Sequence, residues 1–244
     1  MALWGAVMKR LGIFVALGLA LPLWARAGSF EVNPVGVTLS GAHSTGIVTV
    51  TNASDSPTVV QLQLVVWSQE NGEDVYTPSR NLLATPPIFT LPVSGQQTVR
   101  LGLMSKPDAK LETAYRLFLQ EVTPPSESGV QGLQVLLRVG IPVFIEPAVA
   151  AAPELHWSAR RLSATQISVQ AVNDGSAHVQ IGTMQLSINT QAKPLAERIG
   201  GYILPGKHAS WVFQTPAPLA AGTSLLLTAD TDRSTLHAQL VLGD

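Results

Sequence analysis

From Phe30 onward the chain consists of short runs in which apolar and polar residues alternate, broken by clusters of turn residues. Hardly any stretch shows the spacing of an amphipathic helix. Alternation places successive side chains on opposite faces of an extended strand, so each run predicts a strand with one buried face. The chain is therefore predicted to be all-β.

Turn residues bound the predicted strands in both halves of the chain. Asn71-Gly72 is the strongest hairpin signal, because both central positions of a type I′ turn need a positive φ. Strands are predicted over residues 46–52, 58–67, near 75–76, 97–103, 115–122 and 133–145, and in the second half over 166–173, 180–189, 209–214 and 224–229. Residues 86–91 predict an irregular edge.

The small, featureless stretch at residues 148–153 reads as a linker between two domains. Roughly seven short strands on each side of it fit immunoglobulin-like sandwiches. We therefore expect one sandwich domain over residues 28–147 and a second over residues 154–244.

The first 27 residues are typical of a secretory signal peptide. Lys9 and Arg10 precede an apolar run over residues 11–23, and Ala25-Arg26-Ala27 fits the cleavage rule. The alternative is an uncleaved membrane anchor, but a spanning helix needs about 20 apolar residues and this run is shorter. We expect cleavage after Ala27, export, and no stable membrane insertion afterwards.

The composition limits how the exported chain can be stabilised and what it can bind. It has no cysteine, so burial of apolar surface must replace disulfides and no thiolate site exists. With 46% hydrophobic and only 13% charged residues, part of the apolar surplus is available as surface for a partner. Acidic residues outnumber basic ones, which excludes a basic field for nucleic acid.

No motif predicts catalysis, a metal or a cofactor. The histidines are scattered and none forms an HExxH arrangement, and we expect each to be an ordinary surface or partly buried residue; they are His43, His156, His178, His208 and His237. There is no G-x-S-x-G elbow and no phosphate-binding glycine loop. An exported hydrolase whose site is assembled only by the fold stays open as an alternative.

The segment from Leu133 to Ile145 carries a row of apolar side chains that share one strand face. The row comprises Leu133, Val135, Leu137, Val139, Ile141 and Val143. Two interpretations remain open. The strand is either an ordinary half-buried strand of its own sandwich or an edge strand that offers this row and its backbone to another chain.

Several motifs together resemble the PapD-like periplasmic pilus-assembly chaperones, most closely the archaic chaperone–usher branch. The resemblance is strong over residues 30–147 and thinner beyond. Its motifs are WSQENGED at 67–74, PPIF at 86–89, Val99-Arg100, YRLFLQEV at 115–122, IPVFI at 141–145 and GYILPG at 201–206.

This resemblance implies a boomerang of two immunoglobulin-like domains in the periplasm. It implies that the last strand of the first domain enters the open groove of a pilus subunit, and that the subunit then passes to an outer-membrane usher. The donor residues would be Leu133, Val135, Leu137, Val139 and Ile141. The alternative function is a secreted structural or adhesive tandem module.

The sequence departs from the family where the family anchors the terminal carboxylate of the subunit. Those positions are Gly36 and Pro142, and neither can carry a charge. Because a buried anion without a partner is very costly, another cation would have to bind the carboxylate. Arg116 is the first candidate and Arg100 the second, while an ordinary ion pair is the alternative role for Arg116.

A second departure concerns the hinge between the domains, where the family places an acidic, a basic and an acidic residue. Glu121 fits one acidic position, and Asp230 or Asp232 fits the other. Glu146 stands at the basic position. Arg160, Arg161 and Arg233 are the alternatives for the cation.

Overall fold

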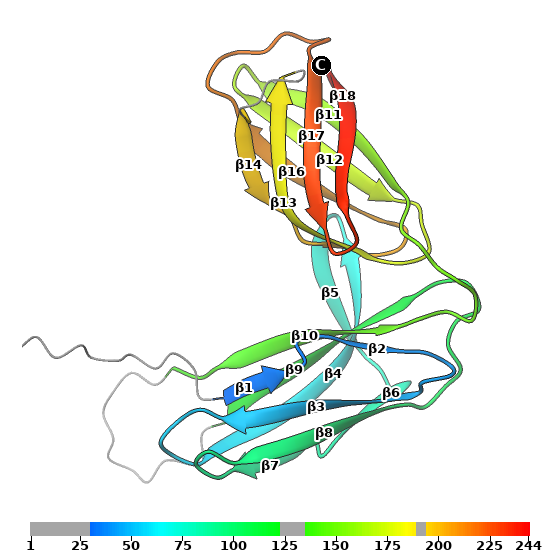
Figure 1. Cartoon of the computed structure of the whole chain (residues 1–244), viewed down its shortest axis with the longest axis vertical. Helices are drawn as coiled ribbons and strands as arrows, with labels where there is room; N and C mark the ends of the chain where they lie inside the picture. The colour runs from blue at the N-terminus through cyan, green and yellow to red at the C-terminus, as the bar shows by residue number, and fades with distance from the viewer. Residues whose placement is uncertain (1–29, 123–134, 189–193) are drawn as a thin grey trace, which may run out of the picture.

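The computed structural model describes residues 30–122, 135–188 and 194–244, which form strands and loops in two lobes joined at an angle (Figure 1). Among these residues no helix is long and apolar enough to cross a membrane. The predicted signal peptide and Leu133 lie outside the described residues. The predicted all-β fold with two immunoglobulin-like sandwiches is confirmed.

The first lobe is a sandwich of two sheets. One has the strand order β1-β3-β8-β6, and the other has the order β2-β10-β9-β4-β5, with β7 also paired to β4. The strands are β1 (Phe30–Asn33), β2 (Val37–Leu39), β3 (Thr45–Asn52), β4 (Thr58–Glu70), β5 (Glu73–Pro78), β6 (Leu82–Thr85), β7 (Ile88–Leu91), β8 (Gln96–Leu103), β9 (Thr113–Val122) and β10 (Arg138–Ile145).

The second lobe has two layers, β14-β13-β17-β18 and β11-β12-β16, joined by a short parallel contact between β11 and β18. A further strand, β15, pairs with β13. The strands are β11 (Leu155–Ser163), β12 (Gln166–Asn173), β13 (Val179–Ile188), β14 (Ala196–Ile199), β15 (Tyr202–Ile203), β16 (Lys207–Gln214), β17 (Ser224–Thr231) and β18 (Thr235–Gly243).

Each lobe has its own core, built by the alternation seen in the sequence. On β3, Val48 and Val50 are fully buried, while Thr49 between them lies on the other face. In the second lobe Phe213 and Met184 are fully buried. Burial of these apolar side chains is the main source of stability in a chain without disulfides.

The hairpin predicted at Asn71-Gly72 is confirmed. Asn71 has φ 53° and Gly72 has φ 84°, as a type I′ turn requires. Glu70 of β4 pairs with Glu73 of β5 across this turn. The hairpin rises from the first lobe to the base of the second, as Figure 1 shows.

Candidate functional site at the edge of β10 and the interlobe cleft

Strand β10 is paired along its whole length on one side only. It pairs antiparallel with β9 from Arg138 to Ile145, whereas β2 pairs with it only at Val143–Ile145. Over Arg138–Pro142, no strand of the described part of the chain covers the second side. The backbone N–H and C=O groups on this side are therefore available to an added strand.

Exposure changes steadily along the apolar row that lies beside this edge. Val135 is 81% exposed, while Leu137 and Val139 are partly buried against the core of the first lobe. Ile141 is only 2% exposed and Val143 is fully buried. Ile141 therefore belongs to the core of its own lobe. The side chains that a partner could contact are Val139 and the apolar residues of the row that precede it.

The strand predicted over Leu133 to Ile145 is shorter in the structure, where it begins at Arg138. Just before it, the main-chain N–H of Glu121 still donates to the carbonyl of Leu137 (2.9 Å). The N–H of Leu137, however, donates to the side-chain Oε2 of Glu121 (3.3 Å). A side chain thus replaces a main-chain partner, and the ladder ends.

Arg116 lies on the outer face of the same sheet, because its neighbours Tyr115 and Leu117 point into the core. It stands directly opposite Pro142 in the β9–β10 register. A Cβ on Gly36 would lie 3.5 Å from Cγ of Pro142. Gly36 and Pro142, where the family carries the charges of its anchor, are therefore neighbours. Arg116 lies beside Pro142 on the neighbouring strand β9.

The guanidinium of Arg116 is held between aromatic rings of the two lobes. It lies 3.8 Å from the ring centroid of Trp67 and 5.7 Å from that of Tyr202. Its Nη2 is 3.8 Å from Oδ2 of Asp74, and the side chain is 13% exposed. Such stacking is favourable for a cation and fixes the position of the guanidinium.

Asp74 is fixed by a second neighbour. The Tyr76 hydroxyl donates to Oδ2 of Asp74 (2.9 Å). Burial, together with this hydrogen bond, raises the pKa of the Tyr76 phenol, so the hydroxyl keeps its proton and remains a donor.

Arg100 does not join this site. It lies on β8 in the other sheet, between Val99 and Leu101, which are both buried. Its exposed side chain therefore projects from the opposite side of the sandwich. The structure brings Arg116 to the cleft between the lobes and places Arg100 away from it.

The lobes meet through a small apolar cluster of Trp67, Ala114, Phe144 and Leu204, with Tyr202 packed against it. A buried side chain of the first lobe, Gln69, binds the backbone of the second lobe. Its Nε2 donates to the carbonyl of Tyr202 (2.9 Å), and its Oε1 accepts from the N–H of Leu204 (3.0 Å).

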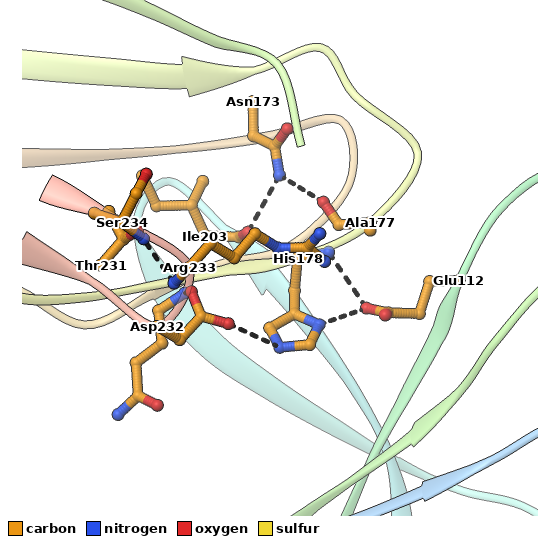
Figure 2. Close-up of polar contacts among 10 residues, drawn as sticks. Glu112, Asn173, Ala177, His178, Ile203, Thr231, Asp232, Arg233 and Ser234 are labelled. Atoms are coloured by element: carbon orange, nitrogen blue, oxygen red, sulfur yellow. Dashed lines mark hydrogen bonds and ion pairs between the residues drawn. The ribbon is translucent and has the colours of Figure 1, made fainter. Parts of the chain in front are cut away.

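An acidic, a basic and an acidic residue do meet at the hinge, but two of the three differ from the sequence prediction. Figure 2 shows His178 between Glu112 of the first lobe and Asp232 of the second. Nδ1 of His178 is 2.6 Å from Oε1 of Glu112, and Nε2 is 3.9 Å from Oδ2 of Asp232. The main-chain N–H of His178 also donates to Glu112 (3.0 Å).

The other residues proposed for the hinge have other places. Glu121 accepts from Leu137 near the start of β10. Arg161, next to Arg160 on β11, pairs with Asp244 (2.7 Å). Arg233 follows Asp232 and lines a cavity with Glu112 and Glu146, so of the three proposed arginines it is the one in the interlobe region.

Asp230, the other acidic candidate for the hinge, accepts hydrogen bonds from Thr183 and Thr235 on the surface of the second lobe. The bond from Thr235, followed by that from Thr183, lowers the pKa of this carboxyl. His178, expected to be an ordinary residue, is the basic residue of the hinge. Across residues 30–122, 135–188 and 194–244, no three His, Asp or Glu side chains gather to hold a metal ion.

Comparisons with solved structures agree with this arrangement. A chain of the CsuC–CsuE chaperone–tip adhesion subunit complex, from archaic chaperone–usher Csu pili of Acinetobacter baumannii, matches with a TM-score of 0.64 at 16% identity, covering 89% of this chain and 100% of that one. The Salmonella enterica SafA pilin–SafB chaperone complex gives 0.61 at 16%, covering 87% and 97%. The E. coli chaperone DraB gives 0.57 at 20%, covering 87% and 95%. At these identities the likeness shows the fold.

Sequence comparison shows the family. A search of curated protein sequences gives no match. The profile of the pili and flagellar-assembly chaperones, PapD N-terminal domain, matches residues 29–151, which is half of the chain's 244 residues. The predicted membership is thereby confirmed: the chain belongs to the family of pili and flagellar-assembly chaperones with a PapD N-terminal domain.

Proposed function

We propose that this chain is exported to the periplasm, binds pilus subunits there by donating a strand, and delivers them to an outer-membrane usher. The binding element is the open edge of β10 with the apolar side chains of Val135, Leu137 and Val139, continued by Leu133. The observation that carries this proposal is that β10 has no described strand partner on one side over Arg138–Pro142, beside those side chains.

The free energy gained when the subunit's groove accepts the donated strand is substantial. Burying one aliphatic side chain is worth about 1.5–3 kcal/mol, and the added strand also gains main-chain hydrogen bonds. A row of such side chains could therefore offset much of the entropy cost of ordering an incomplete sandwich. Ile141 and Val143 hold β10 in its own lobe, so the donor stays attached while the residues before them bind. No nucleotide or catalytic step is needed.

The position of Arg116 favours one direction for the added strand. β2 runs parallel to β10 at Val143–Ile145. An added strand would occupy the same edge of β10 over the preceding residues, Arg138–Pro142. If it also runs parallel to β10, its C-terminal end comes to Pro142, next to Arg116. We propose Arg116 as the anchor of the subunit's terminal carboxylate, since a charge-assisted hydrogen bond stabilises that end. Arg100 faces the other side of the lobe and is not part of this proposal.

The partners are supported by the solved relatives. One is a chaperone in a complex with a tip adhesion subunit from a chaperone–usher pilus, and another is a chaperone bound to a pilin. Both descriptions fit a subunit as ligand, and the first names the usher pathway. The tandem structural or adhesive module has no comparable support.

Periplasmic location rests on the family and on the sequence of the first 27 residues. A further relative is described as the periplasmic chaperone SfaE. Cleavage after Ala27 predicts that protein recovered from the periplasm starts at Gly28, which N-terminal sequencing or intact mass would establish. Retention of residues 1–27 in a membrane fraction would contradict it.

The decisive experiment is co-expression with candidate pilus subunits and purification of the complex. Wild type should co-purify with its subunit in equimolar ratio, and Val135→Asp should lose it, because a charge would enter the apolar groove of the subunit. Val241→Asp is the matched control, since Val241 is an exposed valine on β18 of the second lobe. Normal binding by Val135→Asp, or no subunit bound by wild type, would overturn the proposal.

A further inference from the structure

The two layers of the second lobe are joined along one side by β11 and β18, and that join is short. The two strands run parallel and pair only where Ala159 faces Leu242 and at the next residue of each strand. Continued in the same register, Leu155 would face Ala238, but the strands do not pair there. The sandwich is therefore open along this side over Leu155–Ser158.

The burial of the inward side chains on both strands shows the same opening. Where the strands pair, Ala159 is 7% exposed and Leu242 is 1% exposed. Toward the start of β11, Trp157 and Leu155 are only partly buried, and so is Ala238 on β18. These three side chains pack against the core of the second lobe, so the opening reaches that core.

A cavity of about 510 Å³ lies in this opening. Its apolar lining includes Leu155, Trp157, Val179, Leu236 and Ala238. The volume lies within the range of roughly 300–1,000 Å³ that is typical of ligand pockets. No residue of β9 or β10 lines it, so a partner bound here would leave the proposed donor edge free.

Both strands beside the cavity have an unpaired main-chain edge. One side of β11 pairs with β12 from Leu155 onward, and one side of β18 pairs with β17 over Thr235–Val241. Over Leu155–Ser158 and Thr235–Val241, no strand in the described ranges pairs with the other side. A purely apolar ligand would leave these N–H and C=O groups to water, whereas an extended peptide would pair with them.

The charges that line the cavity favour an anionic partner. Arg233 lines it, His237 is the other titratable residue of the lining, and no Asp or Glu residue takes part. Arg233 also borders the cavity that contains Glu112 and Glu146, but it forms an ion pair with neither. A carboxylate on the partner would therefore gain a charge-assisted hydrogen bond from Arg233.

We infer that the opening between β11 and β18 is a second docking site, which takes an extended segment of a partner protein. Apolar side chains at alternate positions of the segment face the cavity, and an acidic residue reaches Arg233. The main chain of the segment pairs with the free edges of β11 and β18. The site does not depend on strand donation by β10, so its partner can bind while the first lobe holds a subunit.

The test uses a synthetic peptide of about six residues, the usual length of a strand. Its ends are blocked, valine alternates with threonine, and one end carries a glutamate. Isothermal titration calorimetry should show that it binds the free protein, and hydrogen exchange should slow at amides of β11 and β18. With lysine in place of the glutamate, affinity should fall by about tenfold or more. Absence of binding by the glutamate peptide would overturn the inference.

Two further outcomes of the hydrogen-exchange measurement would also overturn it. Decanoate is an apolar anion without a peptide main chain, so it should not slow the amides of β11 and β18. Equal protection by decanoate would mean that the cavity takes an aliphatic acid instead of a strand. Protection by the peptide that is confined to β10 would mean that the peptide binds the donor edge and that the second lobe has no such site.

Cavity-filling variants locate the site. Ala238→Phe fills the cavity from β18, and Gln239→Phe is the matched control, because Gln239 is the next residue, is exposed and does not line the cavity. Affinity for the glutamate peptide should fall by about tenfold or more with Ala238→Phe and stay unchanged with Gln239→Phe. Urea unfolding verifies that both are folded. Equal affinity of the two variants would refute the site.

A charge-reversal variant tests the site without touching the core. Arg233→Glu should lower affinity for the glutamate peptide by about tenfold or more, and Arg80→Glu, at an exposed arginine of the first lobe, should not. An unchanged affinity of Arg233→Glu would contradict the assigned contact. Ala238→Phe should still co-purify with a pilus subunit, so a failure of this inference is distinguishable from a failure of the proposed function.

Discussion

Phe144 of β10 and His178 of the second lobe stack face to face, with ring centroids 3.5 Å apart and an interplanar angle of 6°. Phe144 lies on the strand whose opposite end carries the proposed donor row. The carboxylate of Glu112, 5% exposed, accepts from both the ring and the backbone of His178. The contact between the lobes and the donor edge thus share one strand.

His178→Ala is expected to weaken the contact between the lobes. It removes the ring from Phe144 and takes one of two donors from the buried Glu112 carboxylate, which costs about 1–3 kcal/mol. Urea unfolding should show this loss, and small-angle X-ray scattering should show a broader distribution of overall dimensions. His156→Ala is the control, because the His156 side chain is 59% exposed. Equal effects of the two substitutions would contradict the role of His178.

The sequence predicted strands best where the apolar alternation was long. β12 has the predicted limits, residues 166–173, and β3, β8 and β9 begin within two residues of prediction. The strands β1, β2, β6 and β15 have four residues or fewer, too short to establish a period. Each of them forms because it pairs with a longer strand beside it. β10 was predicted too long because alternation identifies a face but does not say where the partner strand ends.

The candidate site was predicted in part, for the same reason. The apolar row and Arg116 could be identified from local patterns and the family resemblance. That Arg116 lies opposite Pro142 depends on the register between β9 and β10. The hinge residues Glu112, His178 and Asp232 come from three separate segments with no pattern in common, so only the fold could bring them together.

Asn52→Ala is expected to lower the free energy of unfolding. Asn52 is 3% exposed, and its Nδ2 donates to the carbonyls of Ser56, Leu91 and Pro92. Without the amide the buried carbonyl of Leu91 loses this donor, whereas the carbonyls of Ser56 and Pro92 still accept from Ser54 and Gly95; the loss costs about 1–3 kcal/mol. Urea unfolding would measure it, with Asn81→Ala as control because Asn81 is exposed and bonds through its main chain. A change no larger than that of the control would contradict this account.

Gly140→Ala is expected to destabilise the first lobe, whereas Gly102→Ala should be almost neutral. A Cβ on Gly140 would lie 2.8 Å from Cε1 of Phe118, and at Gly102 nothing lies within 4 Å. Phe118 cannot move freely, because Tyr76 packs edge-on against it and Arg138 lies 4.0 Å above its ring. We expect a loss of about 1–3 kcal/mol for Gly140→Ala by thermal or urea unfolding. A neutral result would mean that Phe118 relaxes.

Ile141→Ala and Val135→Ala should separate the part of β10 that stabilises its own lobe from the part that serves a partner. Ile141 is 2% exposed in the core, so its truncation should cost the free chain about 2–5 kcal/mol. Val135 is 81% exposed, so Val135→Ala should change the stability of the free chain by less than about 0.5 kcal/mol. Urea unfolding of the free variants measures both.

Binding of the subunit, unlike the stability of the free chain, should depend on Val135. Its truncation removes apolar surface that is buried only in the complex, so subunit affinity should fall even though the free chain keeps its stability. If Val135→Ala instead destabilises the free chain as strongly as Ile141→Ala does, the row is already buried within its own lobe. The open edge of β10 would then have no side chains to offer, and strand donation from it could not stabilise a subunit.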